Sequence, residues 1–181
     1  MTLPQAPWSQ DLYLQALAFA ARRHGAQAVP GTGFPYVTHL ASVAQEVMAA
    51  LAAEPGRDGS LAVTAALLHD VIEDTPTPAA EVESHFGPRV LAAVLALTKN
   101  PDLPKQDSMA DSLCRILEQP PEVAMVKLAD RSVNLGPPPG HWTPEKIAAY
   151  RAEAQQILDR LGAASPFLAR RLAERIAGFG N

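Results

Sequence analysis

Four polar side chains lie close together in segment 66–75, ALLHDVIEDT, within a stretch that is otherwise apolar. They are one histidine and three acids: His69, Asp70, Glu73 and Asp74. Burying such groups is unfavourable unless they are paired or bind a metal. Positions four apart share one face of a helix, so we expect His69 beside Glu73 and Asp70 beside Asp74. An imidazole nitrogen and a carboxylate oxygen from His69 and Asp70 would suit a divalent metal.

This acidic helix end is open to two interpretations. The acids could simply reach solvent where the helix leaves the core. Acidic side chains near a helix C-terminus interact unfavourably with the helix dipole, however, so three of them there favour a compensating cation.

Two further residues strengthen the metal interpretation. His39 lies in the apolar segment PYVTHLASVA, and Asp130 lies near the end of VAMVKLADRSVNL. A lone histidine there is more often structural, and a lone buried aspartate usually pairs with a base, for which Lys127 and Arg131 are available. Together with His69 and Asp70, however, the set offers two imidazoles and two carboxylates. Such a set suits Mn, Fe, Zn or Co and leaves positions for water and substrate.

Helical patterns dominate the elements that would position these residues. In Ser9–Arg23, apolar residues fall on one stripe, and Ser9 is a plausible N-cap. Further helices are expected over 36–54, 59–75, a short segment after Thr77-Pro78, 89–99, 106–118, 122–134, 143–161 and from 165 onward. We find no strand alternation and no internal repeat. The prediction is one all-α domain of about eight or nine helices over 1–181, with a core at about 11–161 and C-terminal helices over 143–178 packed on it.

The composition restricts the function classes. The chain has 181 residues, a formal net charge of −4 and one cysteine. The net charge argues against a nucleic-acid binder with a basic surface, although a small anionic ligand needs only a local cationic patch. No apolar run approaches the roughly 20 residues of a membrane span, and the N-terminus lacks the basic and apolar regions of a signal peptide. We therefore expect a cytoplasmic protein without membrane or nucleic-acid partners, as a monomer or homodimer.

Three segments make the chain resemble the HD-domain metal-dependent phosphohydrolases. Within that family it is similar to the RelA/SpoT-type guanosine polyphosphate 3′-pyrophosphohydrolase domain and its small stand-alone relatives. The segments are RHGAQAVPGTGFPYVTHLASVA, ALLHDVIEDT and VKLADRSVN, with HFGPRVLAAVLALTK between the last two. The likeness covers roughly 11–161 and implies an HD-domain helical bundle.

The resemblance also implies residue roles and a reaction. The implied metal ligands are His39, His69, Asp70 and Asp130, usually for Mn²⁺, with Mg²⁺, Fe, Zn or Co as alternatives. The implied catalytic acids are Glu73 and Asp74, and the expected substrate-binding residues are Asn134, Lys127, Arg131 and Tyr36. The implied reaction removes the 3′-pyrophosphate of guanosine tetra- or pentaphosphate, giving pyrophosphate and GDP or GTP.

The chemistry of these side chains agrees with such a reaction. Glu73 and Asp74 could orient the attacking water, take its proton, or hold a second Mg²⁺ brought by the substrate. Lys127 and Arg131 are candidate charge partners for the substrate, although for Lys127, one turn before Asp130, the role of a structural counter-ion is favoured.

The chain departs from the family where basic residues would reach the nucleotide. Val29-Pro30 occupies the first such place, and Leu135-Gly136-Pro137 follows Asn134. The substrate is therefore open: a small phosphorylated molecule, most simply a nucleotide, but not necessarily guanosine tetraphosphate. Two alternatives remain, a nucleotide-binding or regulatory protein with little or no turnover, and a purely structural helical domain. The structural domain would leave the buried His-Asp set unexplained.

Overall fold

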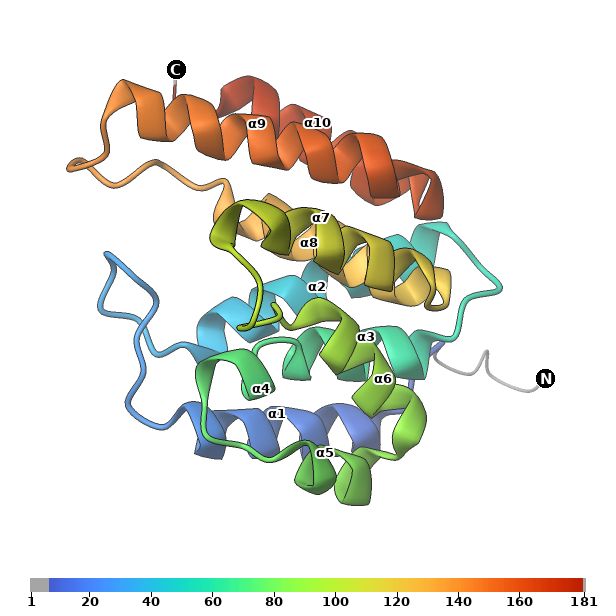
Figure 1. The fold of residues 1–181 in the computed structure, drawn as a ribbon. Coiled ribbons are helices and arrows are strands. Elements are labelled where there is room, and N and C mark those ends of the chain that lie inside the picture. Colours follow the sequence, from blue (N-terminus) through green and yellow to red (C-terminus); the bar gives the residue numbers. More distant parts are fainter. Residues whose placement is uncertain (1–6, 181) are drawn as a thin grey trace.

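The fold, seen in a computed structural model, is built from helices (Figure 1). The structure describes residues 7–180, except the side chain of Lys105; residues 1–6 and 181 of the predicted domain lie outside the described residues. The helices are α1 (Gln10–His24), α2 (Val37–Ala53), α3 (Gly59–Leu68), α4 (Val71–Asp74), α5 (Ala79–Phe86), α6 (Pro88–Leu97), α7 (Lys105–Leu117), α8 (Pro121–Asn134), α9 (Pro144–Leu161) and α10 (Pro166–Gly178). Apart from the short α4 and a 3₁₀ turn at Gly162–Ala164, nine helices are described, which confirms the predicted all-α class.

Helix α3 lies at the centre of the bundle. All of its residues except Ser60 are buried, as expected from its nearly uniform apolar sequence. It packs against α1, α2, α6 and α8. At its N-terminus the Asp58 carboxylate accepts a hydrogen bond from the backbone N–H of Leu61 at 3.0 Å. The segment that follows α3 therefore begins in the buried centre of the bundle.

The expectation of one continuous helix over 59–75 was wrong. Helix α3 ends at Leu68, and α4 begins at Val71, so His69 and Asp70 lie in the interruption. The backbone N–H of Asp74 donates to the carbonyl of Asp70 at 2.8 Å, so α4 is a single helical turn with Asp70 as its N-cap. Glu73 and Asp74 consequently follow one turn after the interruption.

Helix α8 is the second buried element. It packs on α2 and α3 on one side and on α9 and α10 on the other. Figure 1 shows α9 and α10 as a pair that covers α7 and α8, with α1 at the opposite end of the molecule. The N-cap predicted for α1, Ser9, is present, and Thr143 and Ser165 cap α9 and α10; each of the three side chains accepts a backbone N–H of the first turn.

The long connection between α1 and α2 forms a small hairpin. Ala28 and Pro35 make an isolated antiparallel bridge, and the N–H of Val29 donates to the carbonyl of Phe34 at 2.8 Å. No β-strand occurs within residues 7–180, in agreement with the sequence pattern. Within that same range, every helix is too short or too polar to cross a membrane.

Candidate metal site and active-site cleft

Four predicted ligands converge from three parts of the fold. His39 lies in the first turn of α2, His69 and Asp70 lie between α3 and α4, and Asp130 lies near the end of α8. Nε2 of His69 is 2.9 Å from Oδ2 of Asp70 and 3.7 Å from Oδ1 of Asp130. Nε2 of His39 is 3.7 Å and 3.5 Å from the same two oxygens. The two imidazole nitrogens are 3.4 Å apart.

These separations fit a shared metal ion. Protein ligands lie about 2.1 Å from a transition metal, so neighbouring ligand atoms are about 3.0 Å apart at 90° and about 3.4 Å apart at the tetrahedral angle. His39, His69 and Asp70 together form a group that could hold an ion. Oδ1 of Asp130 lies 3.5 Å from Nε2 of His39 and 3.7 Å from Nε2 of His69, which makes Asp130 a candidate fourth ligand.

Two hydrogen bonds orient the ligands on the α3 side. Nδ1 of His69 lies 2.8 Å from the carbonyl of Ala66, so the proton of the neutral ring belongs on Nδ1 and the lone pair of Nε2 faces the site. The hydroxyl of Tyr36 donates to Oδ2 of Asp70 at 2.6 Å. The Tyr36 ring itself stacks on His24, with 4.7 Å between centroids. Tyr36, predicted to bind substrate, thus contacts a candidate metal ligand.

Asp130 is held in the same manner by two neighbours on α8. Nζ of Lys127 lies 3.2 Å from Oδ2, and Nδ2 of Asn134 donates to Oδ1 at 2.6 Å. Both were predicted substrate contacts, and Lys127 also had the alternative of a counter-ion. The ion pair between Lys127 and Asp130 is the contact that a counter-ion role of Lys127 requires.

The carboxylates make the site strongly electronegative. Burial disfavours the charged form of His69, but Asp70 and Asp130 outweigh it and raise the His69 pKa well above its usual value. Burial also disfavours ionised Asp70, yet His69 lowers the Asp70 pKa to about 2. The Asp130 pKa is held well below normal despite burial, chiefly by Lys127. The site therefore keeps two carboxylates ionised and favours a positive charge between them, as metal binding requires.

Glu73 and Asp74 lie at the wall of a cleft next to this site. Both Glu73 oxygens are bound by Lys99: Nζ lies 2.6 Å from Oε1, and the backbone N–H donates to Oε2 at 2.8 Å. Oδ2 of Asp74 accepts from Nε2 of Gln27 at 3.1 Å. Gln27 is bound in turn to His24, the ring under Tyr36. Each acid is thus held by one polar partner from a loop.

The cleft has a volume of about 650 Å³, in the range of small-molecule sites. It is lined by Tyr36, Asp70, Glu73, Asp74, Leu97, Lys99, Ser108, Met109, Lys127, Asp130, Arg131, Asn134, Trp142, Lys146, Ala149, Tyr150 and Glu153. The predicted substrate contacts all lie on this wall, together with the acids and two of the ligands. His39 and His69 lie behind it and are buried.

Arg131 is the most unusual residue of the wall. It is only 6% exposed, and its guanidinium carbon lies 4.3 Å from the centroid of the Tyr150 ring. Its one ion pair, from Nη2 to Glu153, is long at 3.4 Å. Nε and Nη1 are buried and find no hydrogen-bond partner within the described part of the chain. Buried donors without acceptors are unfavourable, so an anionic ligand would stabilise this side chain.

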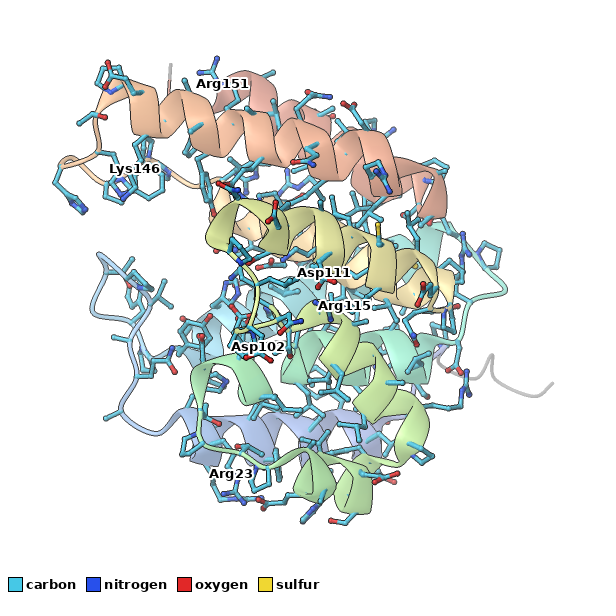
Figure 2. All side chains as sticks on the ribbon, viewed as in Figure 1. Arg23, Asp102, Asp111, Arg115, Lys146 and Arg151 are labelled. Carbon is cyan, nitrogen blue, oxygen red and sulfur yellow. The ribbon has the colours of Figure 1, made fainter. Side chains whose placement is uncertain are left out.

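Two cleft lysines had been given no role from the sequence, Lys99 and Lys146. Lys99 follows α6 and contacts Glu73 across 26 residues of sequence. Lys146 starts α9, and its Nζ lies 4.4 Å from the centroid of the Trp142 ring (Figure 2). The lysine in LTKN follows an amphipathic helix, and the one in TPEK lies in the first turn of another. Neither pattern differs from that of an ordinary surface lysine.

Comparisons with known proteins agree with this geometry. The chain matches the family model of the HD domain over residues 16–166. It is 35% identical over 153 residues to guanosine-3′,5′-bis(diphosphate) 3′-pyrophosphohydrolase MESH1 of Homo sapiens, covering 82% of this chain and 83% of that protein. It is also 35% identical to the guanosine-3′,5′-bis(diphosphate) 3′-pyrophosphohydrolase of Aquifex aeolicus, over 74% of this chain and 18% of that protein. A solved structure, described as a metazoan ortholog of SpoT that hydrolyzes ppGpp, is similar with a TM-score of 0.79 and 29% identity over 99% of both chains.

Proposed function

The chain belongs to the HD-domain family, and we propose that it is a metal-dependent phosphohydrolase acting on guanosine-3′,5′-bis(diphosphate) or a closely related nucleotide. The reaction is cleavage of the bond between the 3′ oxygen and the pyrophosphate by water, which releases pyrophosphate and GDP. The observation that most supports this is the convergence of His39, His69, Asp70 and Asp130 beside a cleft wall that includes Glu73 and Asp74. The relatives named above supply the substrate class.

The four converging side chains would hold the metal. Their mixed nitrogen and oxygen donors suit Mn, Fe, Zn or Co, and we propose Mn²⁺ because the resemblance to the HD-domain hydrolases implies it. A bound divalent metal lowers the pKa of a water ligand and neutralises a phosphoryl oxygen. Asp74 has one oxygen bound to Gln27, which leaves the other to accept the proton of the attacking water. Glu73, held through both oxygens by Lys99, would orient that water.

Arg131 is the residue that we propose for binding the substrate phosphates. Its Nε and Nη1 are buried, lack acceptors within the described residues and belong to a side chain of the cleft wall. Phosphate oxygens would accept from both donors. Lys146 adds a further positive charge to the same wall. Tyr36, Asn134 and Lys127 would then act by holding Asp70 and Asp130.

The proposal is tested with purified protein, Mn²⁺ and guanosine-3′,5′-bis(diphosphate), with pyrophosphate release as the measurement. We expect release by the unmodified protein and none by Asp70→Ala, because that variant loses one candidate ligand and the partner of His69. Asp159→Ala is the control, since Asp159 is exposed, accepts a hydrogen bond from Gln155 of the same helix and does not belong to the cleft wall. Full activity in the Asp70→Ala variant would rule out the mechanism.

A second candidate substrate is favoured by the hairpin at the cleft. Residues 25–35 contain no charged side chain, although Tyr36, which follows them, belongs to the cleft wall. Because this hairpin carries no positive charge, the cleft could bind a phosphorylated nucleotide other than the guanine nucleotide for which the relatives are named. The same assay with other phosphorylated nucleotides would identify such a substrate by a higher kcat/KM.

The domain organisation, the compartment, the oligomeric state and the partners of the protein are also proposals. We propose that residues 1–181 form one domain, that the protein acts in the cytoplasm as a monomer or homodimer, and that it binds neither nucleic acid nor membrane. Size-exclusion chromatography with light scattering tests the oligomeric state.

A further inference from the structure

The connection between α6 and α7 fixes a proposed catalytic group. Lys99 is the second residue after α6, and it binds both oxygens of Glu73 with its backbone N–H and its ammonium group. The ammonium pKa is raised, because the Glu73 hydrogen bond outweighs the effect of burial. A backbone donor is involved, so the position of Glu73 depends on the path of the chain at Lys99 as well as on its side chain.

That path is fixed from the next helix by Arg115. The last carbonyls of a helix have no partner within the helix itself. At the end of α6, Arg115 of α7 donates to three of them: Nη1 to Leu95 at 2.5 Å and to Ala96 at 3.2 Å, and Nη2 to Thr98 at 2.8 Å. The carbonyl of Thr98 belongs to the peptide group whose N–H is that of Lys99. One guanidinium group therefore holds the peptide that donates to Glu73.

Asp111 sets the orientation of this guanidinium group. Its Oδ2 accepts from Nε of Arg115 at 2.8 Å, one turn earlier on α7. Figure 2 shows the two side chains together on the face of α7 that is turned toward α6. A pair of this kind on a helix surface contributes little by itself. The three carbonyl contacts give it a further role, because together with the bond to Asp111 they engage all three nitrogens of a fixed planar fork.

We propose that Arg115, which does not belong to the cleft wall, is a positioning residue for the reaction: through the end of α6 and Lys99 it holds the Glu73 carboxylate in place. This inference rests on the proposed function, since it assigns its effect to a catalytic group of that site. A displacement of about 1 Å at such a group can lower the rate up to about a hundredfold. The effect belongs in kcat, because Arg115 touches neither the ligands nor the buried donors of Arg131.

The kinetic test uses Arg115→Ala and the conservative Arg115→Lys, which keeps the charge and the aliphatic stem but lacks the planar fork that spans the three carbonyls and Asp111 at once. We expect kcat to fall about tenfold in both, with KM changed less than about twofold and the Mn²⁺ content unchanged. Arg89→Ala is the matched control, because Arg89 is an arginine at the opposite, N-terminal end of α6 and pairs with Asp58 outside the cleft. In a Glu73→Gln background, Arg115→Ala should have almost no further effect. An equal fold-loss in both backgrounds, or no loss at all, would overturn the proposal.

A second measurement does not depend on activity. The Lys99 amide is hydrogen-bonded to Glu73, so its hydrogen exchange, followed by NMR, reports the proposed linkage. We expect exchange at Lys99 to become about tenfold faster in Arg115→Lys and to stay unchanged in Arg89→Ala. Unchanged exchange at Lys99 would refute the positioning role. Faster exchange in a protein that hydrolyses no nucleotide would instead support the linkage while the proposed function fails.

Discussion

Tyr36→Phe separates two roles that the same residue could have. The resemblance to HD-domain hydrolases implies a substrate contact, whereas the structure shows the hydroxyl donating to Asp70 Oδ2 at 2.6 Å. Phenylalanine retains the ring that stacks on His24 and removes only this hydrogen bond. A hydrogen bond to a charged group contributes about 1.5–3 kcal/mol. Since about 1.4 kcal/mol is a factor of ten, Mn²⁺ affinity should fall roughly 10- to 100-fold.

Isothermal titration of metal-free protein with Mn²⁺ measures this loss directly. Tyr13→Phe is the matched control, because Tyr13 is also half-buried but lies on α1, away from the candidate ligands. Circular dichroism should show the same helicity in all three proteins. An unchanged Mn²⁺ affinity combined with a raised KM would refute the positioning role of the Tyr36 hydroxyl and restore the substrate contact.

Three further predictions concern the charges of the site. Because the carboxylates raise the His69 pKa, Mn²⁺ must displace a proton from His69 when it binds at pH 7. The affinity of the protein for Mn²⁺ should therefore fall about tenfold per pH unit below that pKa. Heats of Mn²⁺ titration that do not depend on the buffer would contradict this. Arg131→Lys should raise the KM for the nucleotide about tenfold with a smaller change in kcat, since lysine cannot replace Nε and Nη1. An unchanged KM in steady-state assays would show that Arg131 does not bind the nucleotide. Lys127→Met leaves Asp130 without its counter-ion. It should lower the free energy of unfolding by about 3–5 kcal/mol in EDTA, and by less with Mn²⁺. Equal losses of this free energy in urea titrations under both conditions would count against the counter-ion role.

The helices and the candidate ligand residues could be singled out from the sequence because each depends on local patterns. Apolar stripes, proline stops and capping residues mark most helix ends to within a residue or two, as at Ser9 and Thr143. The His-Asp dipeptide and its two distant partners were recognisable because few apolar segments contain such side chains. Their convergence to within 3.7 Å, however, depends on how α2, α3 and α8 pack.

The partners of the site residues could not be predicted, since they are set by loops. Lys99 reaches Glu73 only because the end of α6 lies beside α4, and Arg115 fixes that end through backbone carbonyls. A carbonyl has no sequence signature, so an arginine that binds three of them has the pattern of any surface arginine. Arg131 was singled out from its place beside Asp130, but the lack of acceptors for two of its donors is visible only in the structure.

The interruption between α3 and α4 explains how one short segment serves two purposes. Successive residues of a regular helix point about 100° apart, yet Nε2 of His69 and Oδ2 of Asp70 approach to 2.9 Å. They do so where the helical hydrogen bonding is broken, at the end of a helix that the core surrounds on all sides. Helix α4 then resumes for a single turn, in which Glu73 and Asp74 are bound by Lys99 and Gln27 rather than by the candidate metal ligands. A continuous helix would place these acids directly above His69 and Asp70, whereas the interruption gives the two pairs the separate partners that their proposed separate roles require.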